Sequence, residues 1–239
     1  DIRLFEESIQ IYRPKLCYLM PNFQNPTGYS YTKEKKLAIM EIAKKYDLLI
    51  VEDDYLSDFN FYSSDCCSLK SLDENNTIIY IKSFSKIFMP GLRLGFLVIP
   101  PKYSREILSA KHTSDISTSG LNQRVFDLYL KKGIWKKRIE YMKSIYKMRF
   151  DAMQQSLEKY LLKGTVEYIP PKGGLNFWFG LPEGYSSNQL YHEAAKENIL
   201  ILPGSIFFPN QKDSRYFRLS IAALDPNEIE YGIKKLSRV

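Results

Sequence analysis

The stretch KSFSKIFMPGLRLG, residues 82–95, sets several reactive side chains close together. Ser83 and Ser85 precede Lys86, and Arg93 follows Lys86 by seven residues. The segment therefore offers an amine, two hydroxyl groups and a guanidinium. A guanidinium carries a permanent charge and a planar fork of donors, which suits an anionic group. The spacing raises the question of which ligand would use all four groups.

Other polar side chains fall at the ends of predicted strands. Short apolar runs predict strands at Lys15–Met20, Leu48–Val51 and Thr77–Ile81. Asn25 follows the first run, Asp53 and Tyr55 follow the second, and the residues of the opening stretch follow the third. Ligands of an open parallel sheet bind beyond the carboxyl ends of its strands, so these side chains are expected at one edge. Arg93 is expected to enter the next strand, Leu94–Ile99, and to face the same crevice.

Each residue by itself has an ordinary structural explanation. A lysine after a strand is usually a surface residue, and an Asp-Asp pair is often a turn or a helix cap. Asn25 belongs to NPTG, which is a good turn sequence, and Arg93 suits an ion pair at a strand end. Turn formation does not explain why Lys86, Arg93 and Tyr55 occur together, and their joint order favours a ligand site.

The elements around these residues predict an α/β fold. A helix is expected from a cap at Thr32 to Tyr46, with Leu37, Met40 and Ala43 on its buried side. Strands that alternate with helices and read as apolar runs predict a mainly parallel sheet covered on both faces.

The second half predicts a different arrangement. A long helical pattern runs from Gly133 to Leu162, and short strands and two further helices follow it. We expect two domains: residues 1–132, which are α/β, and residues 133–239, a small α+β domain that begins with the long connecting helix.

Composition limits the possible functions. The 239 residues include 34 Lys and Arg against 27 Asp and Glu, a net charge of +7, but the basic residues are scattered. Scattered lysines argue against a nucleic-acid-binding module, which needs a clustered cationic face. Three cysteines (Cys17, Cys66, Cys67) and two histidines (His112, His192) show no metal-ligand spacing, so no metal site is expected. No membrane span or signal peptide is predicted, and the cysteine usage favours the cytoplasm.

The motifs together resemble a known family. NFQNPTG, LLIVEDDY, SFSK followed by PGLRLGF, and the late FRLS resemble the fold type I aminotransferases, which use pyridoxal phosphate. VEDDYLSDF and IYIKSFSKIFMPGLRLGFLVIPP are most similar to the aminotransferase-like domain of MocR-type regulators of the GntR class. The resemblance covers nearly the whole chain. It implies that residues 1–132 belong to the cofactor-binding large domain of that fold.

The resemblance also implies a role for each residue. Lys86 would form the Schiff base with pyridoxal 5'-phosphate and move the proton during catalysis. Asp53 would face the pyridine nitrogen, while Tyr55 and Asn25 would contact the ring hydroxyl oxygen. The phosphate would be held by Ser83, Ser85 and Arg93. Arg218, in YFRLS, would bind the carboxylate of a substrate. Lys86 and Asp53 are therefore expected in one crevice, about one cofactor ring apart.

The resemblance implies two settings for this site. The first is the effector-sensing domain of a GntR/MocR-type transcriptional regulator, which reaches DNA through a winged-helix domain outside this chain. The alternative is a free-standing class I/II aminotransferase that moves an amino group from an α-amino acid to a 2-oxo acid. A small amino acid or amine and a second copy of the chain, as a homodimer, are the expected partners.

The chain resembles only the C-terminal portion of the family's fold. A glycine-containing turn that cradles the phosphate and an aromatic residue that stacks on the ring precede the strand at Lys15 in the family, and nothing before Pro14 resembles them. We therefore expect weak cofactor binding by the isolated chain, an exposed sheet edge, and self-association.

Overall fold

The computed structural model describes residues 1–62, 67–161 and 164–239. Cys66 and Leu162, part of the expected loop and the expected helix end, lie outside the described residues. Contacts divide the chain into two compact units, which are described separately. The first unit comprises Asp1–Asn22, Tyr31–Asp58 and Ser64–Tyr141, and the second comprises Phe23–Ser30, Phe59–Ser63 and Met142–Val239. The domain boundary near residue 132 stays a prediction.

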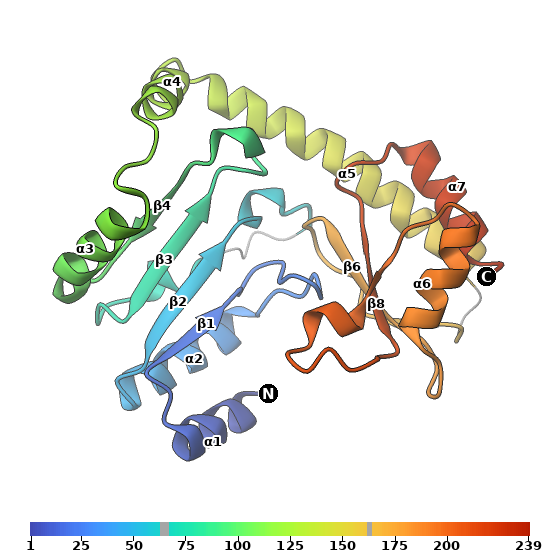
Figure 1. The fold of residues 1–239 in the computed structure, drawn as a ribbon, viewed down its shortest axis with the longest axis horizontal. Helices are drawn as coiled ribbons and strands as arrows, with labels where there is room; N and C mark the ends of the chain where they lie inside the picture. The colour runs from blue at the N-terminus through green and yellow to red at the C-terminus, as the bar shows by residue number, and fades with distance from the viewer. Residues whose placement is uncertain (63–66, 162–163) are drawn as a thin grey trace. The chain divides into compact units, whose positions relative to one another are not determined.

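The first unit is built on a four-stranded sheet (Figure 1). Its strands are β1 (Leu16–Leu19), β2 (Leu49–Asp54), β3 (Ile78–Ser83) and β4 (Gly95–Val98), in that spatial order. β1, β2 and β3 are parallel, whereas β4 runs antiparallel to β3. The expectation of a mainly parallel sheet is confirmed, with one antiparallel strand added.

Two helices cover one face of this sheet. Residues of α1 (Ile2–Tyr12) and α2 (Lys33–Lys45) form a hydrophobic cluster with Ile50 of β2 and Ile78 of β3. Figure 1 shows α2 behind the strands and α1 below it, near the N-terminus. Burial of this cluster removes apolar surface from water and so stabilises the packing of both helices on the sheet.

The opposite face of the sheet is partly exposed. Strand alternation and the pairing register place Leu16, Tyr18 and Leu97 on one face, and these side chains are 52%, 51% and 49% exposed. We call these three residues the open face. The expectation that both faces are covered is wrong for the described part of the chain, because no described helix packs over these side chains.

Helix α2 buries a charged residue. Thr32 caps the helix, as expected, and Met40 and Ala43 are buried. Leu37, however, is 44% exposed, and Lys36 is completely buried in its place. The Lys36 amine donates to Asn22 Oδ1 at 2.7 Å and to the Cys67 carbonyl at 2.8 Å. These two hydrogen bonds replace the hydration of the amine, and Lys36 can therefore be buried on the inner side of the helix.

The remaining helices complete the first unit and lead into the second. They are α3 (Ser104–Asp115), α4 (Gly120–Lys131) and the 27-residue α5 (Ile134–Tyr160), which continues into the second unit. Short 3₁₀ turns lie at Ser57–Phe59, Lys70–Leu72, Pro90–Leu92, Pro101–Tyr103 and Gly204–Phe207.

The second unit is an antiparallel sheet with helices, the α+β arrangement expected. The strands β5 (Glu167–Tyr168), β6 (Asn176–Gly180), β8 (Tyr216–Ser220) and β7 (Leu202–Pro203) lie in that order, and α6 (Ser187–Lys196) and α7 (Pro226–Leu236) accompany them. Its core holds the rings of Phe150, Phe177, Phe179 and Phe217. None of the described helices has the length and apolarity needed to cross a membrane.

Candidate functional site

Asp53 lies inside β2 rather than after it. The strand extends to Asp54, and alternation places Asp53 on the face of the sheet that carries Tyr18 of the open face. Ser83, the last residue of β3, lies on this same face. Two of the predicted residues, Asp53 and Ser83, therefore lie on one face near the carboxyl ends of adjacent strands, while Tyr55 follows directly after β2 and is half-buried.

The Asp53 carboxylate has a partner that the sequence did not predict. The Tyr18 hydroxyl of β1 donates a short hydrogen bond to Asp53 Oδ2. Burial of the hydroxyl and this bond raise the pKa of Tyr18 well above its ordinary value. The contact of Tyr18 with Asp53 could have been predicted only from the register of β1 against β2, because the two residues are 35 positions apart in the sequence.

Asp54 points to the opposite, buried face and forms a structural cluster. Its carboxylate accepts hydrogen bonds from Ser57 and Tyr80 at 2.6 Å and lies 3.3 Å from the Lys82 amine. Lys82 also contacts Asp58 at 2.6 Å. Burial alone would raise the pKa of Asp54, but Lys82 and the hydroxyl donors lower it below its ordinary value. The pair Asp53-Asp54 thus contains one site candidate and one structural anion.

The loop between β3 and β4 is anchored by aromatic and aliphatic side chains. Leu92 and Leu94 are buried against Phe126 of α4. Phe84 packs on Phe126 with 4.4 Å between ring centroids, and Phe88 packs on Tyr129 at 4.2 Å. Apolar residues from Phe84 to Leu94 therefore fix the loop to α4, which holds the intervening polar residues at the surface.

The anchored loop leaves two cations exposed. Lys86 and Arg93 are exposed, and among the described residues their side chains form no hydrogen bond or ion pair, in contrast to Lys82. Ser85 is half-buried, and its N–H donates to the Ser83 hydroxyl at 3.3 Å. An amine, a guanidinium and two hydroxyls at the end of β3 and on the loop that follows form a donor set suited to an anionic ligand with a reactive carbonyl.

Arg93 does not lie in a strand. The expectation that it enters the next strand is wrong, because β4 begins only at Gly95. Pro90 starts a 3₁₀ turn that ends at Leu92, and Arg93 caps it in the left-handed region with φ of 52°. The turn uses the fixed φ of proline at its first position, and it moves the guanidinium out of the sheet.

In the second unit, Asn25 and Arg218 are in direct contact. Arg218 Nη1 donates to Asn25 Oδ1 at 2.6 Å across 193 residues of sequence. Arg218 lies on β8, which pairs with β6 through Trp178 and Asn176. These predicted residues are therefore brought together by the fold.

A glycine brings the Asn25 loop close to β6. Gly28 has φ of 67°, and a Cβ atom there would lie 2.5 Å from the Asn176 carbonyl oxygen. Any side chain would therefore push the loop away from the strand. Gly28, the last residue of NPTG, is therefore required by this packing as well as by the turn.

The predicted site residues are divided between the two units. The first unit carries the amine, the carboxylate, the phenol, the hydroxyls and Arg93, and the second carries the amide and Arg218. Lys86 and Asp53 are both in the first unit, and their expected separation of about one ring stays a prediction.

Comparison with known proteins identifies the relatives of the chain. Residues 11–236 match the family model of aminotransferase class I and II. The 2-aminoadipate transaminase of Thermus thermophilus is 34% identical over 100% of the chain and 60% of its own length. The transcriptional regulator TauR of Rhodobacter capsulatus is 32% identical over 95% of the chain and 46% of its own length.

A solved structure shares the fold across the full chain. The α-aminoadipate aminotransferase of Thermus thermophilus, complexed with N-(5'-phosphopyridoxyl)-L-leucine, matches with a TM-score of 0.93 and 34% identity. The match covers 100% of this chain and 61% of that one. The chain thus spans about 60% of the length of these aminotransferases. It belongs to the class I and II aminotransferase family.

Proposed function

We propose that the chain is the part of an aminotransferase-like domain that holds pyridoxal phosphate and the amino acid or amine that reacts with it. Family membership and the phosphopyridoxyl ligand of the Thermus structure imply this cofactor. The observation that carries the proposal for this chain is the loop that presents Lys86 and Arg93 without protein partners among the described residues.

The residues present fit the cofactor chemically. Lys86 supplies an amine for the aldehyde, and Arg93, Ser83 and Ser85 supply donors for the phosphate. Asp53 supplies a carboxylate for the ring nitrogen, and the Tyr18 hydrogen bond fixes its orientation. Tyr55 would face the ring hydroxyl oxygen, and in the second unit Asn25 accepts a hydrogen bond from Arg218.

The bound cofactor would supply an electron sink for a carbanion next to the amino group. Asp53 would stabilise the proton on the ring nitrogen. Lys86 Nζ would carry a proton to and from the substrate carbon. Arg218 would bind the substrate carboxylate through its fork of donors, and its contact with Asn25 would orient that fork.

The same site serves two settings, and relatives of both kinds match the chain. In a GntR/MocR-type regulator, the domain would sense the cofactor or an amino compound and act on DNA through a winged-helix domain. In a free-standing aminotransferase, it would transfer the amino group to a 2-oxo acid. Homodimer formation and a cytoplasmic location complete the proposal, supported by the open face and by the half-buried free thiols of Cys17 and Cys67.

Selective labelling of Lys86 tests the site. The full-length gene product is incubated with pyridoxal phosphate, reduced with borohydride and digested, and each labelled lysine is quantified by mass spectrometry. We expect most of the label on Lys86, no label there in Lys86→Ala, and roughly tenfold less in Arg93→Gln, because a charged hydrogen bond to phosphate is lost.

Lys172→Ala is the matched control, since Lys172 is also exposed. The amount of label on Lys86 in this variant should equal that in the wild type. Label spread over exposed lysines with no preference for Lys86 would contradict the proposal. The two settings are distinguished with the full-length gene product: formation of a 2-oxo acid from an amino acid indicates the enzyme, and cofactor-dependent DNA binding indicates the regulator.

A further inference from the structure

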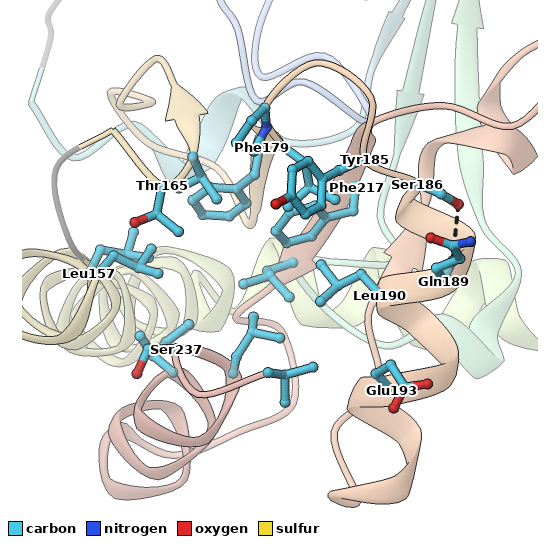
Figure 2. Close-up of a pocket in the computed structure, with 18 residues that line it drawn as sticks. Leu157, Thr165, Phe179, Tyr185, Ser186, Gln189, Leu190, Glu193, Phe217 and Ser237 are labelled. Atoms are coloured by element: carbon cyan, nitrogen blue, oxygen red, sulfur yellow. Dashed lines mark hydrogen bonds between the residues drawn. The ribbon is translucent and has the colours of Figure 1, made fainter.

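The second unit contains a cavity that the proposed function does not use. Its volume is about 360 Å³, and it lies between the C-terminal part of α5, the sheet, α6 and α7 (Figure 2). Its deep wall is formed by buried apolar residues. These are Leu157, Phe179, Leu181, Phe217 and Ile233, none more than 9% exposed.

The wall favours an apolar, ring-shaped occupant. Figure 2 shows the rings of Phe179, Phe217 and Tyr185 along one side, with Leu157 and Leu190 reaching in from the helices. Phe179 and Phe217 are stacked at 5.1 Å. Water in such a cavity finds few hydrogen-bond partners, whereas an apolar molecule gains dispersion contacts with the whole lining. An apolar cavity of about 150 Å³ already accommodates benzene, so this cavity admits a two-ring molecule.

The lining also selects against anions. Among its described residues it contains no lysine, arginine or histidine, and the one carboxylate side chain, that of Glu193, is paired with Lys196 at 2.7 Å. A ligand carboxylate or phosphate would therefore lose its hydration without gaining a cation. The hydroxyl groups of Thr165, Tyr185 and Ser237 also line the cavity and can hydrogen-bond one neutral polar group.

We propose that this cavity binds an uncharged aromatic molecule of about two rings that carries one hydrogen-bonding group. The cavity is lined by none of the residues Lys86, Arg93 and Arg218, and its ligand would be uncharged, unlike theirs. The amino acids and phosphates of the proposed function require cations, and this cavity excludes anions. Binding here therefore holds or fails independently of the proposed function.

Indole and indole-3-acetate form a matched pair of probes, since they share the ring and differ in charge. Affinity is measured by calorimetry, and the ligand is located from the methyl NMR resonances of Leu157 and Ile233. We expect indole to bind at least about tenfold more tightly than indole-3-acetate, with shifts at both methyl groups.

Leu190→Trp fills the cavity and should weaken indole binding at least about tenfold. Leu200→Trp adds the same ring at a site that is 77% exposed, and should bind indole as the wild type does. Circular dichroism checks that both variants fold. If Leu190→Trp does not fold, the methyl shifts in the wild type decide the location. Absence of indole binding, tighter binding of the acetate, or shifts that spare Leu157 and Ile233 would overturn the proposal.

Discussion

Asp53 and Asp54 are adjacent in the sequence but perform different tasks. Asp54 is buried among Lys82, Ser57 and Tyr80 and stabilises the ends of β2 and β3. Asp53 faces the other side of the sheet, where the described contact is with the Tyr18 hydroxyl. The alternation of side chains along a strand separates the two carboxylates, and only the one on the face shared with Ser83 is a candidate for the cofactor.

Replacing Asp53 tests this arrangement at the residue scale without any cofactor. The pKa of Tyr18 is raised by burial and by the hydrogen bond to Asp53, so Asp53→Asn should lower it toward the ordinary value of about 10. The tyrosines are labelled with ¹³C at the ring carbon that bears oxygen, and Tyr18→Phe assigns the resonance.

Asp47→Asn serves as the control, because Asp47 is an exposed aspartate of the same unit. It should leave the titration of Tyr18 unchanged. An equal titration midpoint in the wild type and Asp53→Asn would mean that the hydrogen bond does not form in solution.

At the scale of elements, β2 carries a buried carboxylate that ties it to a 3₁₀ turn. Glu52 is completely buried, and its two oxygens accept the N–H groups of Leu69 and Lys70 at 2.8 Å each. Burial raises the pKa of Glu52 to about 7, although the two N–H donors oppose this change. The strand and the turn are therefore joined by a group that titrates near neutral pH.

This raised pKa predicts a pH-dependent stability. The folded state keeps a proton on Glu52 that the unfolded chain releases above pH 4.5, the ordinary value. The free energy of unfolding should therefore be highest below pH 4.5 and fall by about 3 kcal/mol as the pH rises to 7. Glu52→Gln should remove this fall.

Urea unfolding at pH 5 and pH 7 measures the effect. The chain has two tryptophans, Trp135 in the first unit and Trp178 in the second, so Trp178→Phe leaves a fluorescence signal from the first unit alone. The exposed Glu74→Gln should retain the fall in stability. If the free energy of unfolding fell equally between pH 5 and pH 7 in Glu52→Gln and Glu74→Gln, Glu52 would not titrate in this range.

At the scale of the whole molecule, the sheet of the first unit has one face covered by helices and one open face. Leu16, Tyr18 and Leu97 leave apolar area in water on that face, and β4 is exposed along its length. Exposed apolar faces and unpaired edge strands favour association. The solved relative extends well beyond the part matched by this chain, which covers 61% of it.

We expect the isolated chain to self-associate through the open face. Leu97→Glu places a charge there and should weaken association at least about tenfold in sedimentation experiments. Leu200→Glu introduces the same charge at an exposed leucine of the second unit and should associate like the wild type. A wild-type chain that stays monomeric at tens of micromolar would contradict the expectation.

The sequence by itself determined many of the elements, the family and the candidate residues. Apolar runs and helix caps are local signals, so β1–β3, α2 and the long helix α5 could be predicted. The order of the motifs carried the resemblance to the aminotransferases, and the family model matches residues 11–236. The helices α1, α3 and α4 were not predicted.

Only the tertiary structure decided which partners those residues have. Tyr18 reaches Asp53 because β1 and β2 pair in one particular register, and Asn25 meets Arg218 because a loop at Gly28 packs closely on β6. Likewise Lys36, rather than Leu37, is buried because Asn22 and Cys67 offer it acceptors. These outcomes depend on contacts between residues far apart in the chain, and local sequence patterns carry no information about such contacts.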